Sequence, residues 1–411
     1  MSRQPSPLIP NAVRSERSAQ SVWHRLSPHL LLFVVFCFWF SLYTYPSILT
    51  PYLDELNASH SFSGVVVGSY GFTQMLLRLP AGILSDKLRK KKIFVSAGLL
   101  FSLISALGLI SSRELWLILI LRAMAGVAAA MWVQMSTLYI SYYRGGDSWK
   151  AMGRVNFANT SATMLATLTG GSMANRWGWA YAFIPAAAVA GLGLVASLFL
   201  REEQREPADD GRELSLKDAL MIGREKLLLK TALLALLAQL VTFATAQGFV
   251  PIYAKQLGAR TDQIALMATL ATLPRAIASL FGGRMAGRKR MAATHLILFG
   301  FLVNGLMIAA LPLMKHLGLI VVSQMICGFG SGLQMTLLMG LCTQNISSER
   351  KSTAMGFFQA VYGIGMVLGP VMVGGLSDLL TLNIAFVFIG AISLFGAWVV
   401  SRLDLIPQSA R

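Results

Sequence analysis

Twelve apolar segments, each long enough to cross a lipid bilayer, constrain this chain more than any other feature of its sequence. They fall near residues 29–51, 63–84, 93–111, 115–140, 153–175 and 179–200, and then near 229–250, 264–285, 293–313, 317–341, 353–376 and 383–402. A helix needs about 20 apolar residues to span the hydrocarbon core of a membrane. We therefore expect an all-α integral membrane protein with twelve transmembrane helices.

The composition supports a membrane protein and argues against several other classes. Only 13% of the 411 residues are charged, about half the share found in soluble domains. The three cysteines, Cys37, Cys327 and Cys342, lie in apolar segments without metal-ligand spacing, so we expect inert buried thiols. No phosphate-binding glycine loop or nucleophile motif is present. We expect no enzyme activity, no cofactor and no metal.

A charged segment divides the apolar segments into two sets of six. Residues 201–230 hold seven basic and eight acidic residues, which is typical of a solvated linker. We expect a first six-helix bundle over residues 29–200, a cytoplasmic linker over 201–228 and a second bundle over 229–402. Residues 1–28 and 403–411 are then cytoplasmic tails.

The basic residues predict the orientation. With the N-terminus in the cytoplasm, 27 of the 35 lysines and arginines fall in cytoplasmic segments and five in outside loops. Cytoplasmic loops of membrane proteins carry this excess. Both termini are therefore expected in the cytoplasm, in a multi-pass protein of a bacterial inner or plasma membrane. The net charge of +17 then reflects the anionic lipid bilayer as a partner, and no nucleic acid.

The two sets of helices resemble each other. Ala-Met-Gly opens the fifth helix at 151–153 and the eleventh at 354–356. Gln-Met-Ser at 134–136 corresponds to Gln-Met-Thr at 334–336. These offsets are about half the chain, which indicates an internal duplication. Parallel repeats of this kind build proteins with one central site between the halves.

The loop between the second and third helices carries the most specific local motif. A glycine, Gly82, is followed four residues later by Asp86 and then by a basic cluster that includes Lys87, Lys90 and Lys91. This pattern resembles the loop signature of the major facilitator superfamily, although Arg89 replaces its usual glycine. The resemblance covers nearly the whole chain and implies two bundles that rock about a central site.

The same resemblance implies a cytoplasmic gate. Asp86 would contact the start of the eleventh helix near Ser352 and Thr353, closing the cytoplasmic side and opening during transport. A solvated topology loop is the alternative. In the eleventh helix, Gly369 and Pro370 resemble an element that drug/proton antiporters carry in the fifth helix, where this chain has no proline. We interpret them as a packing and bending element.

Three arginines lie inside predicted helices: Arg78, Arg122 and Arg275. Arg275 falls near the membrane midplane, and no acidic residue lies in a helix core to neutralise it, so we expect a substrate anion or several polar groups around it. Arg122, with Gly126, resembles an Arg-xxx-Gly element of the superfamily; capping backbone carbonyls or snorkelling is its alternative. Arg78 either serves gating or pairs with Asp86.

Other polar side chains are expected to line the central cavity. These are Tyr43, Gln74, Asn156, Asn159, Gln239, Gln247, Gln334, Gln359 and Tyr362. Each could instead make an interhelix hydrogen bond. As a set they indicate a mixed, aromatic and modestly polar cavity.

The resemblance implies transport of a small organic solute by alternating access, through a secondary active or facilitative carrier that acts as a monomer. Efflux of an amphipathic or anionic compound is the expected activity. Uptake of an organic anion or a sugar is the alternative, and a non-transporting membrane receptor is an alternative of another class. The helix cores contain no Asp, Glu or His, so a coupling ion such as a proton stays open.

Overall fold

The computed structural model describes residues 11–88, 90–143, 148–202, 221–286, 290–346 and 350–403, with the side chains of 11–25, Asp86, 148–151, 283–286, 290–292 and Ser352 excepted. These ranges contain helices and no strand. Most of the predicted linker and almost all of the C-terminal tail lie outside them.

The first half contains six spans. They are α1 (Asn11–Tyr43) with α2 (Pro46–Glu55), α3 (His60–Leu88), α4 (Lys91–Ser111), α5 (Leu115–Ala130) with α6 (Trp132–Ser141), α7 (Ser148–Trp177) and α8 (Trp179–Leu198). The first span is interrupted at Thr44 and Tyr45, and Pro46 then opens α2. Proline fits at the first turn of a helix, where its missing N–H would have no partner within the helix.

The second half repeats this plan. Its spans are α10 (Lys226–Ala244) with the π-helical turn η2 (Thr245–Phe249) and α11 (Val250–Gln256), α12 (Thr261–Ala286), α13 (Arg290–Ala309) with the short η3 (Leu311–Leu313), α14 (Leu317–Leu341), α15 (Lys351–Leu379) and α16 (Leu382–Arg402).

The repeat is visible in the first span of each half. Both spans are interrupted at corresponding places, at Thr44 and Tyr45 in one half and by the π-helical turn that begins at Thr245 in the other. Each then ends on a residue with positive φ, Asn57 (57°) and Gly258 (86°), 201 positions apart. Left-handed residues of this kind end helices, and asparagine and glycine adopt them most readily. The duplication predicted from tripeptides is therefore present in the backbone.

Ten spans are long and apolar enough to cross a membrane by length and composition. The helices α3 and α7 complete the set of twelve, with 29 and 30 residues. Both lie between the halves, α3 against α15 and α7 against α12. Polar residues in membrane helices face such interfaces and cavities. The predicted fold of twelve helices in two six-helix bundles is confirmed.

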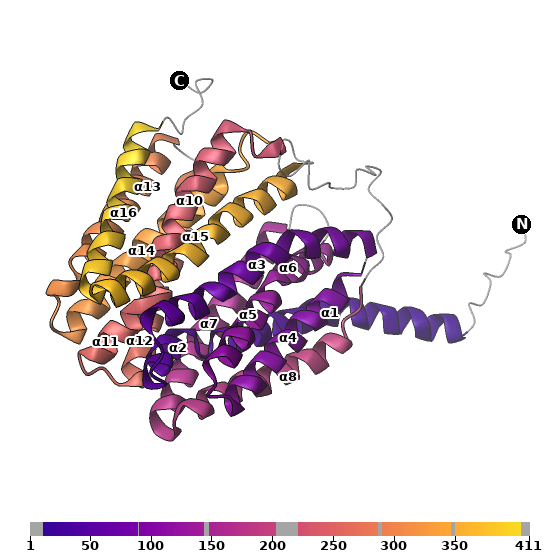
Figure 1. Cartoon of the computed structure of the whole chain (residues 1–411). Helices are drawn as coiled ribbons and strands as arrows, with labels where there is room; N and C mark the ends of the chain where they lie inside the picture. The colour runs from indigo at the N-terminus through magenta and orange to yellow at the C-terminus, as the bar shows by residue number, and fades with distance from the viewer. Residues whose placement is uncertain are drawn as a thin grey trace, which may run out of the picture.

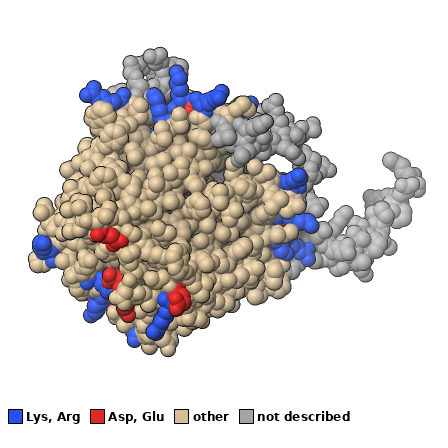
Figure 2. Space-filling view, viewed as in Figure 1, with Lys and Arg blue, Asp and Glu red and all other residues tan. Residues whose placement is uncertain are grey.

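The two bundles converge at one end and diverge at the other (Figure 1). We call the convergent end, which carries α2, α11 and the start of α12, the distal end. The opposite end, from which both termini emerge, is the termini end. On the face shown in Figure 2, basic side chains gather at the termini end, whereas the distal end carries most of the visible acidic side chains together with further basic ones.

Candidate functional site

A cavity of about 240 Å³ lies between the two bundles. Both interrupted spans contribute to its wall, because the break before α2 and the π-helical turn η2 face it. We call it the central cavity. It is lined by Trp39, Tyr43, Pro46, Ser47, Asn159, Thr160, Thr163, Thr167, Ala246, Gln247, Ala268, Thr272 and Arg275. Its size is near the lower end of that for sites that hold small organic molecules.

Two local features of the sequence shape the wall of the central cavity where the first span of each half is interrupted. Pro46 cannot continue the hydrogen bonding of α1, so the chain bends at Thr44 and Tyr45 and exposes the side of Tyr43 to the cavity. In the other half, η2 inserts an extra residue into a helical turn and brings Ala246 and Gln247 to the cavity wall. Such π-helical turns occur frequently at functional sites.

Arg275 supplies the charge of the central cavity. It follows Pro274 in α12, and its side chain is half-buried in the wall. The ion pairs among the described residues join other groups and leave Arg275 without a carboxylate. Placing an arginine at the centre of a membrane helix costs about 2.5–3.5 kcal/mol on insertion scales. A cation held there without an acidic partner is suited to bind an anion.

A smaller cavity of about 70 Å³ opens beside Arg275 inside the second bundle. We call it the bay. It shares Ala246, Gln247, Ala268, Thr272 and Arg275 with the central cavity, so the two cavities adjoin along this wall. Its other lining residues come from α10, η2, α11, α12, α13 and α14 and include Thr242, Asn304, Gln324, Cys327 and Ser331.

Arg122 lies away from both cavities. Only 4% of its surface is exposed, and its guanidinium packs over the rings of Tyr70 at 4.3 Å and Tyr45 at 5.4 Å. It also donates a hydrogen bond of 3.4 Å to the Tyr45 hydroxyl. Aromatic faces attract a desolvated cation. This arrangement joins α2, α3 and α5 within the first bundle.

Arg78 joins the two halves. Its Nη1 donates a hydrogen bond of 3.0 Å to the hydroxyl of Tyr362, from α3 to α15. Nearby in the same seam, Gly356 of α15 approaches Leu79. The α3–α15 contact therefore extends well toward the termini end.

The predicted cavity residues thus separate into two groups. Tyr43, Asn159, Gln247 and Arg275 line the central cavity. The others do not line either cavity: Arg78, Arg122, Gln74, Asn156, Gln239, Gln334, Gln359 and Tyr362. Gln334 accepts a hydrogen bond of 3.2 Å from Asn304, whereas Asn156 is exposed.

Contacts between the halves close the distal end. Lys255 of α11 forms an ion pair of 3.0 Å with Asp54 of α2 and donates to the Pro51 carbonyl at 3.0 Å. Thr50 donates to the Gly248 carbonyl of η2 at 2.6 Å. The same turn of chain therefore touches both the central cavity and the distal closure.

Asp378, at the end of α15, also closes the distal end. Its two carboxylate oxygens accept hydrogen bonds from the backbone N–H groups of His60 at 3.0 Å and Ser61 at 2.8 Å, at the start of α3. Sequence reasoning missed this contact, because an acid at the end of an apolar helix resembles an ordinary interfacial residue.

The predicted gate at the termini end is described only in part. The side chain of Asp86 and that of Ser352 lie outside the described residues. Lys87 and Lys90 are exposed, and a Cβ on Gly82 would meet no atom within 4 Å. The backbone N–H of Lys91 donates to the carboxylate of Glu202 at 2.6 Å.

The predicted packing element of α15 lies against α10. Gly369 touches the Leu240 carbonyl so closely that a Cβ would collide with it, and Gly365 approaches Leu236 in the same way. Close backbone approach at small residues is the usual packing of membrane helices.

Comparison with known proteins identifies the family. The family model described as Major Facilitator Superfamily matches residues 31–260 and 231–411. The chain therefore belongs to the major facilitator superfamily, and it is a membrane transport protein.

Relatives and solved structures agree with this assignment. The chain is 22% identical over 351 residues to a multi-drug resistance efflux pump PmrA homolog of Lactococcus lactis, covering 83% of this chain and 86% of the relative. It is 23% identical over 374 residues to the multidrug resistance protein MdtG of Escherichia coli, covering 87% and 90%. The nucleoside transporter NupG shares its fold, with a TM-score of 0.77 at 15% identity over 92% of this chain and 99% of that one. An inward-facing bacterial homolog of Spinster has a TM-score of 0.74 at 14% identity, over 92% and 96%.

Proposed function

We propose that this chain exports an amphipathic organic anion from the cytoplasm by alternating access. The observation that carries the proposal is Arg275, a cation in the wall of the central cavity with no carboxylate partner among the described residues. The apolar and aromatic part of the wall, with Trp39 and Tyr43, suits the body of such a solute. The relatives named as multidrug efflux proteins support export as the direction.

The contacts at the distal end support a state in which the central cavity is closed toward the outside. The excess of basic residues supports an orientation with the termini end in the cytoplasm and the distal end outside. In this state Asp378 and Lys255 hold the outer side closed. Transport then requires that these contacts break while the termini end closes, and Asp86 is the residue proposed to close it.

Coupling is a separate part of the proposal. Among the described residues, neither cavity is lined by Asp, Glu or His. A proton-exchanging group in the pathway is commonly one of these. We therefore propose that the anion gradient itself, or exchange against a second anion, drives the cycle.

Flux through purified protein in proteoliposomes tests the proposal. Phenylacetate, phenylacetamide and phenethylamine differ chiefly in charge at neutral pH, and each is measured with and without an imposed pH gradient. Wild-type protein should move phenylacetate fastest, and Arg275→Ala should abolish that flux while the protein still inserts. Arg113→Ala, at an exposed arginine, is the matched control and should keep the wild-type rate.

The outcomes separate the alternatives. Preference for the amine, or unchanged phenylacetate flux in Arg275→Ala, contradicts the anion proposal. Faster movement toward the cytoplasmic side than away from it would indicate uptake of an organic anion. Binding without flux of any probe would indicate a receptor.

A further inference from the structure

The bay contains two buried polar groups that no part of the described protein satisfies. The side-chain nitrogen of Gln324, Nε2, has no hydrogen-bond partner, and only 3% of this residue is exposed. The side-chain oxygen of Asn304, Oδ1, also has no partner, and its residue is likewise 3% exposed. Buried polar groups in folded proteins are nearly always paired, so each unpaired one calls for an explanation.

The side-chain amide of Asn304 makes its hydrogen bonds through the nitrogen and leaves the oxygen without a partner. That nitrogen, Nδ2, donates to the Ser331 hydroxyl at 3.3 Å and to the Gln334 side-chain oxygen at 3.2 Å. Both of these partners lie on α14. In this orientation the carbonyl oxygen has no partner, and Asn304 and Gln324 both line the bay.

The hydroxyl groups of the bay do not satisfy these two atoms. Thr242, Thr245 and Thr272 donate their hydroxyl hydrogens to backbone carbonyls of their own helices, at 2.9, 2.7 and 2.9 Å. Among the residues that line the bay, Gln324 thus carries an unpaired neutral donor and Asn304 an unpaired acceptor, and Arg275 lies in the wall that the bay shares with the central cavity.

The bay has the size of a head group and not of a whole solute. Its volume of about 70 Å³ is less than a third of the 240 Å³ of the central cavity. The central cavity adjoins the bay and holds the aromatic residues Trp39 and Tyr43. A solute that reaches into both must therefore place a small polar end in the bay and its larger body outside.

We propose that the bay binds the head of the transported solute, a carboxylate or similar small oxyanion with a hydroxyl or N–H group beside it. This inference rests on the proposed anion transport. Arg275 supplies the opposite charge, and Gln324 donates to an oxyanion oxygen and orients the head. The oxygen of Asn304 accepts from the neighbouring hydroxyl or N–H, which an oxyanion alone would not satisfy. The preferred class is thus an amphipathic 2-hydroxy or N-acylamino acid.

Binding to the purified full-length protein tests the two contacts separately. Dissociation constants are measured by calorimetry for mandelate, phenylacetate and phenylacetamide. Wild-type protein should bind mandelate about five-fold more tightly than phenylacetate, because mandelate adds one hydroxyl for Asn304. Phenylacetamide should bind most weakly. Equal binding of mandelate and phenylacetate overturns the proposed head group without any substitution in the protein.

Substitution of Gln324 tests the donor. Gln324→Met keeps the length of the side chain and removes its amide, and it should weaken phenylacetate binding about ten-fold while leaving phenylacetamide binding much less affected. Gln324→Leu is the second variant should the first be poorly folded, with size-exclusion profiles as the check. Gln134→Leu is the matched control, because Gln134 is buried with an unpaired amide in the first bundle, outside both cavities; it should bind like wild type.

The failure of this inference differs from the failure of the proposed function. Phenylacetate binding that falls in Arg275→Gln but is unchanged in Gln324→Met overturns the bay as the head-group site and leaves anion transport standing. Wild-type protein that does not distinguish phenylacetate from phenylacetamide overturns both.

Discussion

Removing the negative charge of Asp378 should loosen the distal closure. Its carboxylate accepts two hydrogen bonds from the first residues of α3, His60 and Ser61, where the helix dipole also favours an anion. In Asp378→Asn the charge is lost, and an amide N–H replaces one of the two acceptors. Hydrogen bonds to charged groups contribute about 1.5–3 kcal/mol.

Solvent lowers this figure. The Asp378 side chain is 32% exposed, so screening reduces the loss to about 1 kcal/mol. A change of this size shifts a two-state equilibrium about five-fold. We therefore expect the fraction of molecules with an open distal end to rise about five-fold in Asp378→Asn.

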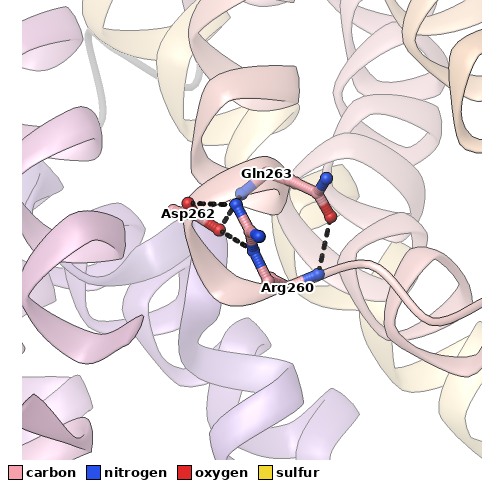
Figure 3. Close-up of polar contacts among 3 residues, drawn as sticks. All are labelled: Arg260, Asp262 and Gln263. Carbon is pink, nitrogen blue, oxygen red and sulfur yellow. Dashed lines mark hydrogen bonds and ion pairs between the residues drawn. The ribbon is translucent and has the colours of Figure 1, made fainter. Parts of the chain in front are cut away.

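The distance between two spin labels measures this fraction. Glu114→Cys and Leu313→Cys place labels on exposed positions at the distal ends of the first and second halves. The matched control is Asp262→Asn, which removes an acid of the same end. Figure 3 shows that Asp262 pairs with Arg260 of the same half and the same turn of chain, with an Nη2–Oδ2 distance of 3.0 Å. An unchanged distance distribution in Asp378→Asn, or an equal shift in Asp262→Asn, refutes the reasoning.

Three further substitutions follow from the packing and the gate. Gly369→Ala should lower stability by about 1–3 kcal/mol, because the new Cβ would collide with the Leu240 carbonyl; thermal unfolding measures it. Tyr70→Leu should lower stability by about 2 kcal/mol through loss of the ring over Arg122, measured in the same way. Asp86→Asn should slow flux more than it weakens binding, measured in proteoliposomes and by calorimetry.

Each of these has its own control. Gly153→Ala adds a Cβ where no atom lies within 4 Å and should leave stability unchanged. Tyr70→Phe keeps the ring and should retain most of the stability; a loss equal to that of Tyr70→Leu would contradict the cation–π contact. Equal losses of flux and binding in Asp86→Asn would contradict its role as a gate.

The helices could be predicted closely because their signal is local. Segment 317–341 was expected from its apolar length, and α14 spans Leu317–Leu341. The orientation signal and the repeat also depend only on residue types at given positions. The breaks were not predicted, because a π-helical turn at Thr245–Phe249 depends on how the half packs and has no distinct local composition.

Site residues could be predicted from the sequence only where the type of residue and its position in a membrane helix together indicate a single role. A midplane arginine without an acid, Arg275, pointed to a cavity by electrostatics alone. Arg122 looked similar in sequence, yet two tyrosines from other helices surround it. Asp378 contacts residues that lie 317 and 318 positions away in the sequence. Gln324 is a candidate ligand-binding residue because its side-chain nitrogen has no hydrogen-bond partner among its neighbours. Contacts between residues far apart in the sequence cannot be predicted from the order of residue types along the chain.

The central claim is that Arg275 selects an anionic solute, and the charge preference of transport tests it most directly. The ratio of initial phenylacetate to phenylacetamide flux is measured for wild-type protein, Arg275→Lys and Arg275→Gln in the same proteoliposomes. Loss of a charge-assisted contact should lower the ratio at least about ten-fold in Arg275→Gln, with Arg275→Lys in between. A ratio that is the same in all three proteins would contradict the account.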